Sequence, residues 1–414
     1  MLQQIKRTET KEYYHPLFSQ RIENFYQEIV NKRWGGGIII RGKVPTADDV
    51  LMISNDYLSL ANHPQIVQDQ ANSLLKHGNG LMMSGVYLNG PSPQQQFEED
   101  MASFMGAESS LLCQSGWCAN IGLVQSLADE STPVYIDMFA HMSLWEGITS
   151  AGATARAFRH NNPGSLEKMI RQHGAGIILV DSIYSTSGTI CPLAEIAAIA
   201  SQYGCIFVVD ESHSLGTHGD HGEGLVASLG LTDQVHFRTA SLAKAFCGRA
   251  GIITCTYAFR DYFSFESRPA IFSSTLLPHE ITSLSTTLNI IRSEEWRRIQ
   301  VHKNAEYLRS SLDQMGYNVS ASQSQIISLE CGSEYHTLIL RDALELRGVF
   351  GAVFVDPATP RNRSLIRFSV HATLSRKEME KIIQACSDVR EEVDYKAWPS
   401  TRRKNRSVRV AKGI

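Results

Sequence analysis

Short apolar runs bounded by polar residues or glycines alternate with longer amphipathic segments through the middle of the chain. The predicted strands are residues 111–113, 134–136, 154–158, 177–180, 205–209, 235–239 and 252–256. Runs of this length are typical of buried strands, and helical patterns fill most of the gaps between them. Such alternation predicts right-handed crossovers and a mostly parallel sheet with helices on both faces, which is an α/β fold.

The segments on either side of this region have helical patterns of their own. The predicted helices are residues 18–30, which form an N-terminal arm, 91–106, and a single long helix from 280 to about 309. Residues 316–393 have the mixed pattern of a smaller α+β domain. We therefore divide the chain into an arm (1–60), a large domain (61–290), a small C-terminal domain (291–395) and a basic tail (396–414).

Composition narrows the class of protein. The 414 residues are 43% hydrophobic and 20% charged, which is ordinary for a globular protein with a large core. A net charge of -3 argues against nucleic acid as the main partner, and the basic stretch from Arg402 to Lys412 is expected to be a solvated, poorly ordered end. No apolar stretch approaches the ~20 residues that span a bilayer. Eight scattered cysteines and the absence of a secretory signal predict a cytoplasmic protein.

Two motifs close neighbouring predicted strands. Asp210 begins the run 210–216 (Asp-Glu-Ser-His-Ser-Leu-Gly), and Lys244 lies in the run 241–245 (Ser-Leu-Ala-Lys-Ala). The carboxyl ends of parallel strands are where α/β proteins bind ligands. A lysine amine forms a Schiff base with the aldehyde of pyridoxal phosphate (PLP), and a carboxylate keeps its pyridine nitrogen protonated. Alone, each residue is more often a helix cap or a solvated charge, so the pair carries the prediction of a PLP enzyme.

Polar residues after three other strands suit the same cofactor. The turn Ser115-Gly116-Trp117 opens a helix, where free N–H groups bind phosphate, although plain capping explains it too. His141 offers a flat ring that stacks on a cofactor, or caps the next helix. Ser182 is a candidate donor to the ring oxygen, or an ordinary turn serine.

Two further side chains are candidates for the site, one for the cofactor and one for the substrate. His213 lies three positions after Asp210 and either bonds the ring oxygen or orients the Asp210 carboxylate. Arg367 lies in an alternating strand, and its guanidinium offers a planar fork for a substrate carboxylate. A structural salt bridge is the alternative for Arg367.

Other functional classes compete with this interpretation. A metallohydrolase would use ligands from the set Asp210, Glu211, His213, His218 and His221. Their spacing matches no closed metal site, and this class leaves Lys244 without a role, so we expect no metal. A non-catalytic binding protein on the same scaffold is a third class, against which the presence of Lys244 argues.

The two motifs resemble the signatures of the α-oxoamine synthases, which are fold-type I PLP enzymes with the aspartate aminotransferase-like fold. The likeness runs from the Ser-Asn-Asp-Tyr-Leu run at 54–58 to about residue 388. Three stretches resemble more specifically the α-hydroxyketone quorum-sensing autoinducer synthases of Vibrio and Legionella: 113–120, 135–147 and 270–278.

The resemblance implies roles for individual residues. It makes Lys244 the Schiff-base lysine, Asp210 the partner of the pyridine nitrogen, and His141 the residue stacked on the ring. The remaining implied cofactor contacts are His213 and Ser182 to the ring oxygen, and Ser241 with Ser115, Gly116 and Trp117 to the phosphate. Ser273 and Ser274 match a stretch that reaches the phosphate of the neighbouring subunit, which implies a homodimer with shared active sites, although capping of the helix that follows is an alternative. Arg367 matches the carboxylate-binding arginine.

The resemblance also implies the reaction. We expect a PLP-dependent acyltransferase that joins a medium- or long-chain acyl-CoA to S-adenosylmethionine or 2-aminobutyrate. Loss of CO₂ would give an α-aminoketone, the precursor of an α-hydroxyketone signal. Residues 90–98 lack the histidine that other family members carry there, and Trp117 replaces a smaller aromatic, which speaks against glycine or alanine as co-substrate. An 8-amino-7-oxononanoate synthase-like enzyme or a class I/II aminotransferase is the alternative.

Overall fold

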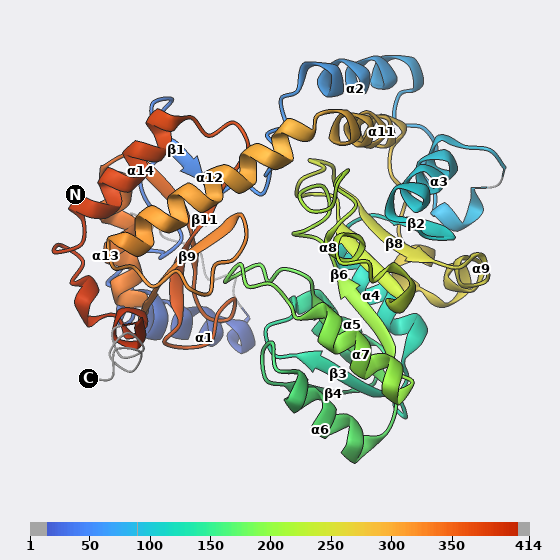
Figure 1. Ribbon diagram of the computed structural model, residues 1–414, viewed down its shortest axis with the longest axis horizontal. Helices are drawn as coiled ribbons and strands as arrows, with labels where there is room; N and C mark the ends of the chain where they lie inside the picture. Colours follow the sequence, from blue (N-terminus) through green and yellow to red (C-terminus); the bar gives the residue numbers. More distant parts are fainter. Residues whose placement is uncertain (1–14, 89, 405–414) are drawn as a thin grey trace.

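The computed structural model describes residues 15–88 and 90–404, which form two lobes with a sheet in each (Figure 1). The larger sheet has the strand order β2-β8-β7-β6-β5-β3-β4. Its strands are β2 (Ser109–Cys113), β3 (Pro133–Asp137), β4 (Thr154–Phe158), β5 (Ile177–Asp181), β6 (Ile206–Asp210), β7 (Phe237–Ser241) and β8 (Gly251–Cys255). β8 is antiparallel to both of its neighbours, and the remaining pairs are parallel. All seven predicted strands and the mostly parallel sheet are confirmed.

Helices cover both faces of this sheet because its central strands are apolar on both sides. Along β5, Ile177 and Leu179 pack in the core beneath α4 (Gly116–Leu127) and α5 (Met142–Ser150). Ile178 and Val180 belong to the core on the other face, together with residues of α6 (Pro163–His173) and α7 (Leu193–Tyr203). This two-residue alternation between two buried faces explains why the strands read as continuous apolar runs.

The smaller lobe has a four-stranded sheet in the order β1-β10-β11-β9. The strands are β1 (Val50–Met52), β9 (Ile326–Gly332), β10 (Val349–Phe354) and β11 (Ser364–Ser369), packed with α12 (Glu295–Gln314), α13 (Glu334–Leu346) and α14 (Arg376–Asp388). The expected small α+β domain is therefore present. β1 pairs in parallel with β10, although it lies inside the segment that we assigned to the arm. The exact domain boundaries stay a prediction.

The predicted long helix is interrupted, which corrects the sequence interpretation. α11 (Pro278–Ser293) packs on α2 (Pro64–His77) in the large lobe, and α12 continues into the small lobe (Figure 1). Glu294 separates them with φ -104° and ψ 60°. Its carboxylate accepts from Nε of Arg297 over 2.6 Å, and Arg297 also donates to the carbonyl of Leu58 over 2.8 Å. The sequence of this segment has a helical pattern without proline or glycine, so it does not indicate the break, which depends on contacts with distant residues.

The arm and the tail are the other peripheral elements. The predicted arm helix is present as α1 (Pro16–Asn24) and a π-helical segment (Phe25–Asn31), and residues 91–106 form α3 (Pro93–Met105). The expectation of a poorly ordered basic end is wrong for its first residues, because Arg403 pairs with Glu330 and Lys404 with Asp313, each at 2.7 Å. Residues 405–414 lie outside the described residues.

The remaining elements are α8 (Leu225–Ser228), α9 (Tyr257–Glu266), α10 (Arg268–Ile271) and short 3₁₀ turns at Gly85–Tyr87, Thr232–Gln234 and Tyr395–Ala397.

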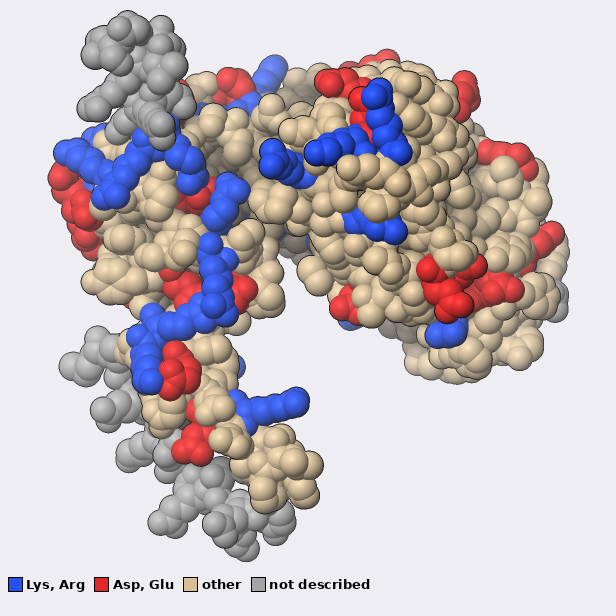
Figure 2. Space-filling view, turned by 90° about the horizontal axis from the view of Figure 1, so that it is seen from below, with Lys and Arg blue, Asp and Glu red and all other residues tan. Residues whose placement is uncertain are grey.

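The surface carries both signs of charge. In the view from below, Lys and Arg form a band along the smaller lobe, with Asp and Glu beside them (Figure 2). Within residues 15–88 and 90–404, no helix combines the length and the apolar character needed to cross a membrane. All eight cysteines are free thiols.

Candidate active site

Asp210 and Lys244 meet at the carboxyl edge of the large sheet. Asp210 is the last residue of β6 and pairs with Thr239 of β7, and Lys244 follows the end of β7. Burial lowers the pKa of the Lys244 amine, Arg367 lowers it further, and the Asp210 carboxylate partly opposes both effects. The neutral, nucleophilic amine is therefore present at a lower pH than in a free lysine. This is the property that a lysine needs to bind an aldehyde.

A buried amide fixes the Asp210 carboxylate. Nδ2 of Asn120, on α4, donates to Oδ2 of Asp210 over 2.7 Å, and the backbone N–H of Ser212 donates to Oδ1 over 2.8 Å. The Asn120 carbonyl oxygen accepts from the Thr239 hydroxyl over 2.6 Å. Asn120, and not His213, orients this carboxylate, so that alternative for His213 is wrong. The sequence signal for Asn120 was a polar residue in the apolar first two turns of the predicted helix.

His141 lies beside this pair and also caps α5. Its Nδ1 lies 2.7 Å from the Ser143 hydroxyl, and its backbone N–H donates to Asp181 over 3.1 Å. Burial lowers the pKa of the His141 imidazole, while Asp210 opposes this shift and Lys244 adds to it. The ring is therefore neutral and fixed through Nδ1. Capping of α5 by His141 is confirmed, and its part in the site, including stacking on a cofactor ring, stays a prediction.

The Ser115 turn presents the N-terminal end of α4 to the same edge. Ser115 is the N-cap of α4, and its hydroxyl accepts from the backbone N–H of Cys118 over 3.1 Å. A Cβ placed on Gly116 would lie 2.5 Å from the Cβ of Ser241, so only glycine lets these two segments touch. In the described part of the chain, the N–H groups of Gly116 and Trp117 make no hydrogen bond. These groups are suited to bind a phosphate.

The two residues predicted to contact the ring oxygen, Ser182 and His213, differ in whether their polar atoms already have partners within the protein. The Ser182 hydroxyl donates to the carbonyl of Asp210 over 3.1 Å and lies 2.8 Å from the Ser214 hydroxyl, so it is fully engaged inside the protein. Nδ1 of His213 lies 2.7 Å from the hydroxyl of Tyr57. Burial lowers the pKa of His213 well below its usual value, and Lys244 and Arg367 contribute to this shift. Both roles stay predictions, with His213 the better placed.

Arg367 projects toward this site from β11 of the small lobe. Its Nη1 donates to the carbonyl of Ser185 over 2.9 Å and its Nη2 to Oδ1 of Asn55 over 2.8 Å. Its Nε has no partner within the described ranges, and none of the ion pairs found there involves this side chain. A buried guanidinium without a carboxylate partner is suited to an anionic substrate group.

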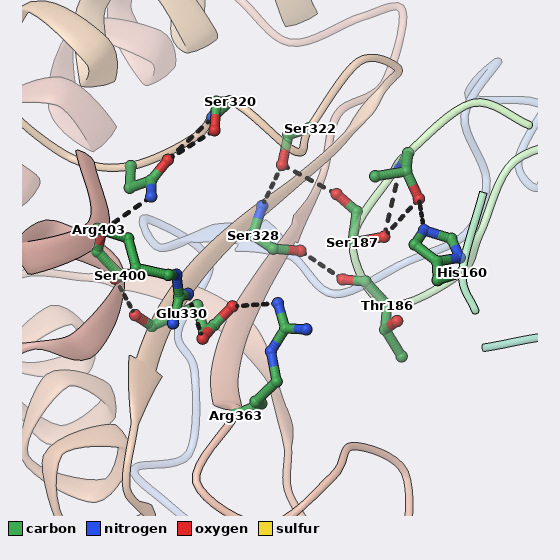
Figure 3. Close-up of polar contacts among 12 residues, drawn as sticks. His160, Thr186, Ser187, Ser320, Ser322, Ser328, Glu330, Arg363, Ser400 and Arg403 are labelled. Carbon is green, nitrogen blue, oxygen red and sulfur yellow. Dashed lines mark hydrogen bonds and ion pairs between the residues drawn. The ribbon is translucent and has the colours of Figure 1, made fainter. Parts of the chain in front are cut away.

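Hydrogen bonds join the two lobes next to Arg367. The loop after β5 carries Thr186, whose carbonyl accepts from the Ser328 hydroxyl, and Ser187, whose carbonyl accepts from Ser322 over 3.0 Å (Figure 3). On its other side, Thr189 contacts Nε2 of His160 over 2.9 Å. The loop that bears Ser182 and Ser185 is therefore fastened to β9, which sets the place of the small lobe relative to Asp210.

The residues of the rival metal site are engaged elsewhere. Glu211 is buried in an ion pair with Arg238, with Oε2 and Nε 2.5 Å apart. The ring of His218 packs edge-on against His302 at 4.8 Å between centroids. Within residues 15–88 and 90–404, no three His, Cys, Asp or Glu side chains are grouped to hold a metal ion.

Ser273 and Ser274 lie at the surface, outside the group of residues around Lys244 and Asp210. The Ser273 hydroxyl donates to the carbonyl of Pro269, and the Ser274 carbonyl accepts from Gln114 over 3.0 Å. The N-cap of α11 is Leu277, so the competing interpretation of the two serines as its caps is wrong. The neighbouring Phe272 is 82% exposed.

Comparisons with known proteins find relatives along most of the chain. Residues 47–386 match the family model described as aminotransferase class I and II. The CAI-1 autoinducer synthase of Vibrio campbellii (strain ATCC BAA-1116) is 47% identical over 368 residues, which cover 89% of this chain and 93% of that protein. The 8-amino-7-oxononanoate synthase of Lysinibacillus sphaericus is 28% identical over 347 residues, covering 83% of this chain and 89% of that protein.

Solved structures show the same fold. A serine palmitoyltransferase from S. paucimobilis, determined with PLP and myriocin bound, superposes with a TM-score of 0.84 at 22% identity, over 92% of this chain and 100% of that one. The 8-amino-7-oxononanoate synthase from Francisella tularensis superposes with a TM-score of 0.74 at 22% identity, over 85% and 99%. The predicted fold-type I architecture is confirmed.

Proposed function

This chain belongs to the aminotransferase class I and II family, and we propose that it is a PLP-dependent acyltransferase of the α-oxoamine synthase type that makes the precursor of an autoinducer. One observation carries the proposal. Lys244, Asp210 and His141 share one edge of the sheet in a chain that is 47% identical to a CAI-1 autoinducer synthase.

The residues at this edge fit PLP by their chemistry. When bound, PLP supplies an electron sink for the bonds of the substrate Cα. Lys244 would hold its aldehyde carbon, and Asp210, kept in place by Asn120, would hold a proton on its pyridine nitrogen. The N–H groups of Gly116 and Trp117 and the Ser241 hydroxyl would hold its phosphate.

Different side chains of the site would have different roles in the reaction. Arg367 binds the carboxylate of the amino donor and fixes which bond of its Cα faces Lys244. The Lys244 amine, whose pKa is lowered chiefly by burial, would accept the Cα proton. Condensation with an acyl-CoA, release of CoA and loss of CO₂ give the α-aminoketone.

We propose S-adenosylmethionine or 2-aminobutyrate as amino donor and a medium- or long-chain acyl-CoA as acyl donor. The bulky Trp117 supports this choice, because its indole stands edge-on to His141 at 6.1 Å and remains 45% exposed. The lack of a histidine in residues 90–98 also supports it.

Mass spectrometry of the products from a panel of acyl-CoAs and amino donors tests this function. We expect an α-aminoketone and free CoA with these two donors, and little product with glycine or alanine. Efficient formation of 8-amino-7-oxononanoate from pimeloyl-CoA and alanine would replace our proposal with the first alternative. Transfer of the amino group without release of CoA would replace it with an aminotransferase.

We further propose that the enzyme is a cytoplasmic homodimer with shared active sites, in which Ser273 and Ser274 reach the phosphate of the neighbouring subunit. Phe272, beside these serines, is 82% exposed, and contact with a second chain would bury it. Eight free cysteines suit a reducing compartment.

A further inference from the structure

We infer that Tyr57 is a positioning residue that keeps the proton of His213 on Nε2, so that this imidazole donates to the ring oxygen of the cofactor. The inference rests on the proposed function for the identity of the acceptor. The position of the proton is a property of the protein alone and is measurable without any reaction.

The contact between the two side chains is short and buried. Oη of Tyr57 lies 2.7 Å from Nδ1 of His213, and both residues are buried. The Tyr57 backbone is held by the small lobe, because its carbonyl accepts from the N–H of Ala372 over 2.8 Å. Nε2 of Gln325 donates to the His213 carbonyl over 2.7 Å. Hydrogen bonds to their backbone carbonyls therefore hold both Tyr57 and His213 in place.

The distances decide which way the hydroxyl proton points. Tyr57 has one proton and two neighbours that accept it: Nδ1 of His213 at 2.7 Å and Oδ1 of Asn55 at 3.3 Å. The longer distance exceeds the usual range for an O–H···O hydrogen bond. Oδ1 of Asn55 already accepts from Arg367 over 2.8 Å. The proton therefore lies toward His213, whose Nδ1 is the acceptor.

The surroundings keep both groups in the protonation states that this requires. Burial raises the pKa of Tyr57 to about 12, so its hydroxyl keeps the proton at neutral pH. Burial, Lys244 and Arg367 hold the pKa of His213 well below its usual value, so the ring is neutral. A neutral imidazole that accepts at Nδ1 carries its proton on Nε2. In the described part of the chain, Nε2 makes no hydrogen bond, and it remains available as a donor.

Nitrogen-15 NMR of the full-length protein, labelled at histidine and freed of PLP, tests the assignment. The His213 signals are identified by their loss in His213→Gln. In the wild-type protein we expect Nδ1 to be unprotonated and Nε2 to carry the proton. In Tyr57→Phe, which keeps the ring but removes the donor, part or all of the proton should move to Nδ1. A proton on Nδ1 in the wild-type protein overturns the inference, whether or not the variant folds.

A binding measurement gives a second readout. Tyr57→Phe should weaken PLP binding about tenfold, as expected for one lost buried hydrogen bond. Tyr317→Phe is the matched control, because its hydroxyl donates to the Cys386 carbonyl over 2.8 Å in the small-lobe core. The control should leave the His213 signals and PLP affinity unchanged. An Nε2 proton that persists in Tyr57→Phe, with unchanged affinity, overturns the positioning role while leaving the proposed acyltransferase intact. Failure of the wild-type chain to bind PLP overturns the proposed function and with it the assigned acceptor.

Discussion

Nδ2 of Asn120 donates to the Asp210 carboxylate over 2.7 Å, and the same amide nitrogen donates to the Ser143 hydroxyl over 2.8 Å. Ser143 in turn contacts Nδ1 of His141 over 2.7 Å. One buried side chain on α4 therefore orients both the Asp210 carboxylate and, through Ser143, the His141 imidazole. Groups fixed in advance of the reaction stabilise developing charge without reorganising, which is the largest single contribution in many enzymes.

Asp210→Asn should lose most of the acyltransferase activity and still bind PLP. An amide does not hold the pyridine nitrogen protonated, so the electron sink weakens, while the phosphate contacts near Gly116 and Ser241 remain. We expect kcat to fall on the order of 10²-fold or more, as for the loss of one electrostatic stabiliser. The measurement is steady-state turnover together with the visible absorption of bound PLP. Near-normal turnover would rule out this role for Asp210.

Asn120→Leu should lower kcat about tenfold or more without removing a group that touches the cofactor. Leucine has a similar volume but donates no hydrogen bond, so the Asp210 carboxylate loses its orientation. Gln125→Leu is the matched control on the same helix, because the Gln125 amide donates to Ser150 away from the site. Equal effects of the two substitutions on kcat would show that Asn120 only stabilises α4.

Mixed dimers test the shared active site. Ser273→Asp with Ser274→Asp places two carboxylates where the partner's phosphate should lie, and Lys244→Ala removes the lysine. Each variant should be inactive alone, and a mixture of the two should regain activity. In a mixed dimer, one site holds both defects and the other is intact. A mixture as inactive as its components, with mixed dimers demonstrated by native mass spectrometry, contradicts the shared site.

Protonation of His218 should destabilise the protein in acid. Burial and, to a smaller extent, the neighbouring His302 lower its pKa from 6.5 to about 3. Between these values the unfolded chain binds a proton that the folded chain does not, so stability falls as the pH falls below about 6.5. The slope for one such group is up to about 1.4 kcal/mol per pH unit.

Urea unfolding from pH 7 to pH 4 checks this prediction. His218→Asn should lose less stability on acidification than the wild-type protein, and His77→Asn, at an exposed position of α2, should behave like the wild-type protein. The same dependence on pH in all three proteins would show that His218 is already protonated in the folded state.

The central strands of the large sheet were predictable because they are buried on both faces and read as apolar runs. Lys244 and Asp210 were predictable because each follows such a run. Tyr57 received no role, because its partner His213 lies 156 residues away. The break at Glu294 and the docking of Arg403 depend on similarly distant partners, Leu58 and Glu330. Local pattern determines which segments fold as strands and helices, but not which buried polar groups then meet.

The central claim is that Lys244 holds the cofactor. Borohydride reduction of the purified holoenzyme fixes PLP to the amine that carries it, and peptide mass spectrometry then locates the label. We expect a single labelled peptide with the pyridoxyl group on Lys244, and no labelled peptide from Lys244→Ala, which should fold but not turn over. A label on another lysine of the wild-type protein, or a Lys244→Ala variant that retains full activity, would contradict the account.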